Sequence, residues 1–207
     1  MSTEQAMLPW KKARELILGL STPLGPETVE LSAASGRILT TDIVSTRQLP
    51  PWDNSAMDGY AVRAADVTVG AKLLVSGTIA AGHPAETQLV AGTAMRIMTG
   101  APMPALADAV IMREEADEAD GQVSFRKAPR PGQHVRRAGE DVQPGSTVLL
   151  AGALLSAGEI GILAALGRLL VSVHRRPSVA IVSTGDELVR ADEQPLSGQI
   201  VNSNAHC

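Results

Sequence analysis

The spacing of hydrophobic positions changes along the chain, and each spacing predicts a different kind of element. Across residues 4–19, apolar side chains recur at steps of three and four, which is the period of a helix with one apolar face. We expect this helix to start after Thr3 and to end at Gly19, with Trp10 packed on its apolar face. A second helix is expected at 159–166, because Ser156 is a good N-cap residue.

The central part of the chain has short apolar runs separated by Gly, Pro and Asp, which is typical of strands joined by turns. We expect strands at 37–44, 72–75, 79–81, 94–98, 109–112, 122–125, 147–150 and 169–173. The acidic run 114–120 is expected to be a solvated turn, and 30–35 a short helix or turn. The even spacing of the central strands predicts a small β-rich, barrel-like subdomain.

The pattern changes again after Pro177. Residues 179–183 form a continuous apolar run, as in a strand that is buried on both faces of a parallel sheet. A polar turn follows at 184–188, where α/β sheets commonly bind ligands. A parallel sheet needs crossover connections of a dozen or more residues, so one strand and its turn cannot complete it. We therefore expect residues 178–207 to pack poorly by themselves and this sequence to be the front part of a longer protein.

Composition narrows the class of protein. Of 207 residues, 44% are hydrophobic and 19% are charged, as in a globular protein with an aliphatic core. The net charge is −4 and no long basic run is present, which argues against nucleic acid as a partner. The one basic stretch, 126–137, contains two prolines and a glycine and is expected to be a solvated loop.

Cysteine usage and the N-terminus predict a cytoplasmic protein. The single cysteine, Cys207, cannot form a disulfide within the chain, which suits a reducing compartment. The first five residues lack an apolar signal core, and no apolar run is long enough to span a bilayer, so no membrane partner is expected. The four histidines are scattered and no CxxC or HExxH is present, which disfavours transition metals.

Four polar clusters stand at predicted turns, where side chains can point into a cleft. They are residues 53–58, 96–104, 139–141 and 183–187. Carboxylates and hydroxyls without histidine or cysteine favour a hard cation such as Mg²⁺. For any single cluster we prefer the alternative that Asp and Asn side chains cap their own backbone. Spacing alone does not bring the four clusters together, and no P-loop, GxGxxG or GxSxG motif is present.

The run 53–63, Asp-Asn-Ser-Ala-Met-Asp-Gly-Tyr-Ala-Val-Arg, resembles the signature of the molybdopterin molybdenumtransferases. This is the MoeA family, whose eukaryotic relative is the gephyrin E domain. Three more stretches resemble family motifs in the same order, at 96–102, 137–141 and 183–188. The first motif is long and specific, and the resemblance covers essentially the whole chain.

The resemblance implies an α+β fold with several regions. A helix-and-strand linker and dimerisation domain would comprise 1–44 and 142–176, with an inserted β-rich, barrel-like subdomain at 45–141. The truncated start of an α/β molybdopterin-binding domain would follow at 177–207. The resemblance also implies a homodimer, with the active site between the second region of one subunit and the later regions of the other. Because those later regions are absent, we expect this chain to be inactive alone.

The activity implied is insertion of molybdenum from molybdate into adenylylated molybdopterin, with release of AMP and help from Mg²⁺. Motif matching implies catalytic roles for Asp58, Thr99, Asp141 and Glu187. It implies cofactor binding by Asn54, Ser55, Ser183, Thr184 and Asp186, with Asp186 and Glu187 as the Mg²⁺ ligands. Further partners would be molybdopterin adenylyltransferase and apo-molybdoenzymes. Two alternatives stay open: a gephyrin-type scaffold without catalysis, and a β-rich dimerisation domain whose polar turns only cap themselves.

Overall fold

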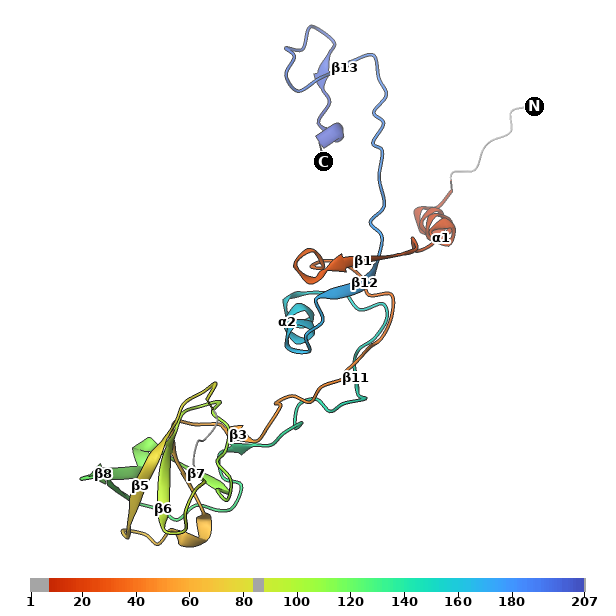
Figure 1. The fold of residues 1–207 in the computed structure, drawn as a ribbon. Coiled ribbons are helices and arrows are strands. Elements are labelled where there is room, and N and C mark those ends of the chain that lie inside the picture. Colours follow the sequence, from red (N-terminus) through yellow and green to blue (C-terminus); the bar gives the residue numbers. More distant parts are fainter. Residues whose placement is uncertain (1–7, 84–87, 207) are drawn as a thin grey trace.

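The computed structural model describes residues 8–83 and 88–206, which form two packed bodies and a C-terminal segment beyond them (Figure 1). We call the part built from residues 26–44 and 147–174 the first body, and residues 54–136 the second body. Helix α1 (Trp10–Leu20) precedes the first body. Among the described residues, no helix combines the length and apolar character needed to cross a membrane.

The first body is a small helix-and-strand unit. Its elements are β1 (Pro26–Glu30), η1 (Leu31–Ala33), β2 (Ile43–Val44), β11 (Thr147–Leu149), α2 (Ala157–Ala165) and β12 (Leu170–His174). Strand β1 pairs with β12, and β2 pairs with β11, both antiparallel. Leu39, Leu155, Leu163 and Val173 are fully buried between these pairs and α2. Residues from the two ends of the body's sequence therefore share one core.

The second body is a curled β-sheet with short flanking elements. They are β3 (Asn54–Ser55), β4 (Gly59–Val62), η2 (Ala64–Asp66), β5 (Lys72–Ile79), β6 (Thr93–Ile97), β7 (Ala109–Met112), η3 (Arg113–Glu115), β8 (Ala116–Ala119), β9 (Gln122–Phe125) and β10 (Val135–Arg136). Six strands form one sheet in the order β7-β4-β6-β5-β9-β8. Only β5 and β6 pair in parallel within that sheet. Strands β3 and β10 pair separately.

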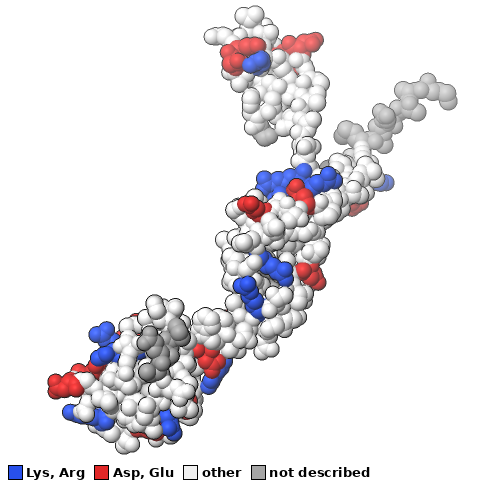
Figure 2. Space-filling model, in the orientation of Figure 1, with Lys and Arg blue, Asp and Glu red and all other residues white. Residues whose placement is uncertain are grey.

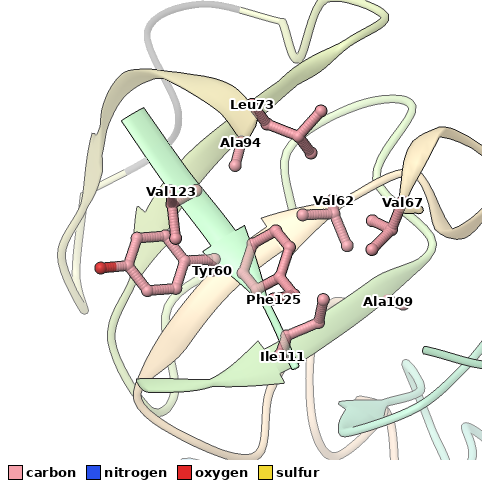
Figure 3. Packing of buried hydrophobic residues seen from close by; sticks show 9 residues of the cluster. All are labelled: Tyr60, Val62, Val67, Leu73, Ala94, Ala109, Ile111, Val123 and Phe125. Atoms are coloured by element: carbon pink, nitrogen blue, oxygen red, sulfur yellow. The ribbon is translucent and has the colours of Figure 1, made fainter. Parts of the chain in front are cut away.

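The middle strands of this sheet are covered on both faces. Because side chains alternate along a strand, Tyr60 and Val62 of β4 enter one apolar cluster while Ala61 enters another. Figure 3 shows the first cluster, in which the rings of Tyr60 and Phe125 meet edge to face with centroids 5.7 Å apart. All four residues of β4 are buried as a result.

Two chain segments, 45–53 and 137–146, connect the bodies and run side by side (Figure 1). The amide of Leu49 donates to the carbonyl of Val142 at 2.8 Å, and the amide of Asp141 donates to the carbonyl of Leu49 at 3.0 Å. The peptide bond between Leu49 and Pro50 is cis. On the face drawn in Figure 2, acidic and basic side chains are mixed over the second body.

Several element predictions are confirmed. The strands predicted at 109–112 and 122–125 have those bounds. Helix α2 begins after Ser156, and a capping box with Glu159 satisfies its first turn. The run predicted at 72–75 lies within β5, which extends to Ile79. The strand predicted at 79–81 is wrong, because Ile79 ends β5 and Ala80 and Ala81 belong to no strand. The predicted strand at 37–44 is reduced to Ile43–Val44, with isolated bridges at Ile38 and Leu39.

Two predictions about the first helix are wrong, and so is the prediction of a turn at 114–120. Helix α1 begins at Trp10, after Pro9, and ends at Leu20, whereas Thr3 lies outside the described residues. Trp10 does not pack on a core, because it is 70% exposed and α1 buries no residue. The acidic run 114–120 is largely exposed, as expected, but it is not a turn, since it includes the end of η3 and strand β8.

The strand predicted at 179–183 is absent. These residues are extended without pairing, and Val179 and Val182 are 78% and 82% exposed. A strand needs a neighbour to satisfy its backbone, and no described strand lies beside this run. The segment contains only the short parallel pair β13 (Leu188–Val189) and β14 (Ile200–Val201), followed by η4 (Asn204–His206). None of its described residues is buried, in agreement with the expected poor packing.

Candidate functional site

Asp58 and Thr99 meet at one end of the sheet in the second body. Asp58 lies just before β4 and Thr99 just after β6, and these antiparallel strands pair Gly59 with Ile97. Oδ1 of Asp58 accepts hydrogen bonds from the Thr99 amide and the Thr99 hydroxyl, both at 2.7 Å. The structure therefore brings together two of the four residues predicted to be catalytic.

These hydrogen bonds set the charge of Asp58. The Thr99 hydroxyl bond first, and then the Thr99 amide bond, lower the pKa of the Asp58 carboxyl, because both donors stabilise the ionised form. The nearby Arg113 guanidinium lowers the pKa further. Asp58 is therefore a carboxylate at neutral pH, with one oxygen held by Thr99.

Gly59 allows β4 to approach β7 closely beside this pair. A Cβ atom at Gly59 would lie 1.9 Å from the carbonyl oxygen of Ile111, a distance that no side chain tolerates. The glycine is thus required by the contact between backbones. This contact fixes the start of β4, which directly follows Asp58.

A cavity of about 190 Å³ opens beside Asp58. Its lining residues are Asp58, Gly59, Tyr60, Arg96, Ile97, Met98, Arg113 and Glu118. Arg96 forms an ion pair with Glu118, and Tyr60 donates a hydrogen bond to the same carboxylate at 2.5 Å. No side-chain hydrogen bond or ion pair joins the guanidinium of Arg113 to another described residue, but its positive charge lowers the pKa of both Asp58 and Glu118.

Asn54 and Ser55 shape the turn that leads to Asp58. Their exposed fractions are 8% and 1%. The Ser55 hydroxyl donates to the Met57 carbonyl at 2.5 Å and accepts from the Met57 amide at 3.2 Å. The Asn54 amide group donates to the Trp52 carbonyl at 3.3 Å. The structure gives both side chains partners within the turn, and their contact with a cofactor stays a prediction.

Asp141 lies at the connection between the bodies and does not line the cavity. Arg136 donates to Asp141 at 2.6 Å from Nη2 and to Glu140 at 2.6 Å from Nε. Within the same turn, the Arg137 amide donates to Glu140, which lowers the pKa of that carboxyl. The motif at 137–141 therefore forms a network of charges with Arg136 of β10, which pairs with β3.

The predicted residues of the C-terminal segment lie far from the second body (Figure 1). Thr184, Asp186 and Glu187 are exposed, and Ser183 is half-buried. Gly185 lies against the Glu187 carboxylate, since a Cβ there would be 2.4 Å from Oε1. The chain does not bring these four residues to Asp58, and their meeting across subunits stays a prediction.

Sequence reasoning missed four residues that line the cavity: Tyr60, Arg96, Arg113 and Glu118. Tyr60 and Arg96 lie within the motifs that resemble the family. Their closeness in sequence to Asp58 and Thr99 could have identified them as site residues. Glu118 was assigned to a turn because its run is acidic. Its partner Arg96 is 22 residues away in sequence and lies on β6, a strand that does not pair with β8, so only the three-dimensional structure shows the contact.

The comparisons with known proteins agree on one family. Residues 8–167 match the model described as the MoeA N-terminal region (domain I and II). A molybdopterin molybdenumtransferase from Haemophilus influenzae is 42% identical over 96% of this chain and 50% of the relative. One from Nostoc sp. is 45% identical over 92% of this chain and 45% of the relative. The chain thus spans about half the length of the curated relatives it matches.

Solved structures show the same likeness. A molybdopterin biosynthesis MoeA protein from Pyrococcus horikoshii OT3 matches with a TM-score of 0.84 and 35% identity. The match covers 96% of this chain and 54% of that structure. Both the family model and the fold include the strands that hold Asp58 and Thr99. The chain therefore belongs to the family defined by the MoeA N-terminal region.

Proposed function

We propose that this chain forms the N-terminal half of a molybdopterin molybdenumtransferase. Such an enzyme inserts molybdenum from molybdate into adenylylated molybdopterin and releases AMP. The observation that carries the proposal is the ionised Asp58 held by Thr99 at the edge of a cavity. The names of the relatives support the same activity.

In this proposal Asp58 orients the substrate. Both hydrogen bonds from Thr99 reach Oδ1 of Asp58, so Oδ2 is left to accept a proton donor of the ligand. The Thr99 hydroxyl donates its hydrogen bond to Asp58 and keeps its lone pairs as acceptors for a second contact. Arg113 also lines this cavity and offers positive charge there, which suits an anionic substrate.

Asp186 and Glu187 are the proposed Mg²⁺ ligands. The described residues contain no group of three His, Cys, Asp or Glu side chains that could hold a metal. Two adjacent carboxylates nevertheless fit Mg²⁺, which usually binds through one or two carboxylates and substrate phosphates. When bound, the ion would offset the charge of the phosphoanhydride and polarise that bond. Ser183, Thr184 and Asp141 would contact the cofactor or substrate nearby.

We further propose that the working unit is a cytosolic homodimer. Helix α1 supports this proposal because its apolar residues are exposed, with Trp10 at 70% and Leu20 at 84%. Exposed apolar surface of this kind is typical of interfaces. Residues 177–207 would then begin an α/β molybdopterin-binding domain, whose other strands would pair with 179–183. Molybdopterin adenylyltransferase and apo-molybdoenzymes are the proposed further partners.

The gephyrin-type scaffold is the alternative function, and the exposed face of α1 favours it equally. A scaffold does not need an ionised carboxylate at a cavity. A chimera separates the two functions: this chain replaces the N-terminal half of the Haemophilus influenzae relative, and AMP release and molybdenum insertion are measured. We expect activity in the chimera and its loss with Asp58→Asn, which keeps the shape of the side chain. Full activity of the Asp58→Asn chimera would refute the catalytic role.

A further inference from the structure

The curled sheet of the second body is closed by a side-chain contact between distant strands. In the sheet order, β8 is the last strand, whereas β4 and β6 are the second and third. Glu118 of β8 nevertheless accepts hydrogen bonds from Tyr60 of β4 at 2.5 Å and from Nε of Arg96 of β6 at 3.0 Å. Figure 3 shows the Tyr60 hydroxyl pointing away from the apolar cluster. We call Tyr60, Arg96 and Glu118 the latch.

The latch lies next to the Asp58–Thr99 pair. Tyr60 is two residues after Asp58, and Arg96 is three residues before Thr99. Tyr60 and Arg96 face each other in the register of β4 and β6, and all three latch residues line the cavity that Asp58 lines. A shift of either strand would therefore move one member of the Asp58–Thr99 pair relative to the other.

The protonation states of the latch favour its hydrogen bonds. The bond from Arg96, and then that from Tyr60, lower the pKa of the Glu118 carboxyl. Burial first, and then the bond to Glu118, raise the pKa of Tyr60. At neutral pH a protonated phenol and a guanidinium thus donate to a carboxylate, which makes strong charge-assisted bonds.

We propose that Glu118 is a positioning residue for the Asp58–Thr99 pair. Through Tyr60 and Arg96 it holds the ends of β4 and β6 at the spacing that lets Thr99 donate twice to Asp58. Its importance for turnover rests on the proposed function, whereas its effect on the Asp58–Thr99 geometry does not. Glu118 itself touches no reacting atom in this proposal.

The direction in which the pKa of Asp58 changes in Glu118→Ala tells whether Glu118 positions the Asp58–Thr99 pair or acts on Asp58 only through its charge. Glu118→Ala removes a negative charge near Asp58 and frees the positive charge of Arg96. Both changes, acting directly, would lower the pKa of Asp58. Loss of the Thr99 hydrogen bonds would instead raise it, because those bonds are the main cause of its depression. Arg113 acts on both carboxyls, since its charge lowers the pKa of Glu118 as well as that of Asp58. Without Glu118 its charge would act on Asp58 alone, which would again lower the pKa of Asp58.

The test is a pH titration of the Asp58 carboxyl by ¹³C NMR in the 207-residue chain, with the Thr99 amide shift as a second signal. We expect Glu118→Ala to raise the pKa of Asp58 and to move the Thr99 amide resonance. Asp117→Ala is the matched control, because Asp117 is the neighbour on β8 and pairs with Arg126 instead. The control should leave both signals unchanged. An unchanged or lowered pKa of Asp58 in folded Glu118→Ala would overturn the proposal.

Tyr60→Phe covers the case in which Glu118→Ala fails to fold. It removes one latch bond without changing charge and keeps the ring in the core. We expect a smaller rise in the pKa of Asp58, and no rise would overturn the proposal. In the chimera, Glu118→Ala should lower kcat roughly tenfold with KM little changed, as expected from misplacement of a catalytic group. An inactive parent chimera would count against the proposed function and not against the NMR result.

Discussion

Arg137 reaches across the connection between the two bodies and donates from Nη1 to Oδ2 of Asp53 at 2.5 Å. The other oxygen of Asp53 accepts from the amide of Ala138 at 2.8 Å. Asp53 opens the first recognised motif and Arg137 opens the third, so the contact joins two motifs that are 84 residues apart. The Ala138 bond, followed by the Arg137 bond, lowers the pKa of the Asp53 carboxyl.

The first prediction concerns this contact. Asp53→Asn removes the charge that both donors stabilise, so the segments 45–53 and 137–146 should separate more often. We expect faster hydrogen exchange at the amides of Ala138 and Gly139, measured by NMR. Asp117→Asn is the control, because it also breaks an exposed arginine pair but leaves the connection intact. Unchanged exchange in Asp53→Asn would show that backbone bonds alone hold the connection.

The second prediction concerns the contact between β4 and β7. Gly59→Ala places a methyl group where the Ile111 carbonyl oxygen stands, so the strands must move apart. Overpacking of this kind costs about 1–3 kcal/mol of unfolding free energy. The Asp58 carboxyl should lose its Thr99 bonds in the same variant. Urea unfolding and the Thr99 amide shift measure the two effects.

Gly161→Ala is the control for the glycine substitution. Gly161 lies in α2, and outside the backbone of that helix no heavy atom stands within 4 Å of the place that an alanine methyl group would take. Alanine is a better helix former by about 1 kcal/mol, so this variant should be more stable. Equal stability of Gly59→Ala and the parent chain would contradict the close approach.

The third prediction is that acid weakens the fold. The pKa values of Asp53, Asp58 and Glu118 are lowered in the folded chain by hydrogen bonds to their ionised forms. The unfolded chain, whose carboxyls titrate at about 4, therefore binds more protons as pH falls. The stability from these groups is complete above that value and is lost as pH falls through the folded pKa values. Urea midpoints measured from neutral to acidic pH should decline across this window.

Thr99→Val provides the matching variant for the acid series. It removes the hydroxyl donor, which is the first cause of the low pKa of Asp58, and nearly keeps the side-chain volume. We expect the pKa of Asp58 to rise and the decline of the midpoint with acid to become shallower. An identical pH profile for the variant would exclude Asp58 as a contributor.

The sequence predicted what local patterns determine. Strands at 109–112 and 122–125 follow from their apolar runs, and the start of α2 follows from Ser156 as a good N-cap residue. Strand β8 was missed because its acids are neutralised by arginines from elsewhere, Glu118 by Arg96 and Asp117 by Arg126. The run at 179–183 was assigned to a strand because its residues favour one, but pairing depends on a neighbour that composition cannot supply.

Part of the candidate site could also be predicted from the sequence, and part required the structure. Motif resemblance named Asp58 and Thr99, and the register of β4 with β6 explains their contact. It could not separate ligand contacts from turn-forming side chains such as Ser55, whose hydroxyl is satisfied by Met57. That distinction depends on burial and on bond direction, which no spacing in the sequence encodes.

The last prediction concerns self-association through α1. Ile17 is 65% exposed on a helix that buries none of its residues, and an isolated helix of 11 residues is marginal in water. A second copy that covers this face would stabilise the helix and remove apolar surface from water. Ile17→Glu should therefore shift the chain from dimer to monomer in sedimentation velocity and lower its helix content. Val69→Glu is the control, because Val69 is 59% exposed in the second body, away from α1. A dimer that survives Ile17→Glu unchanged would place the interface elsewhere.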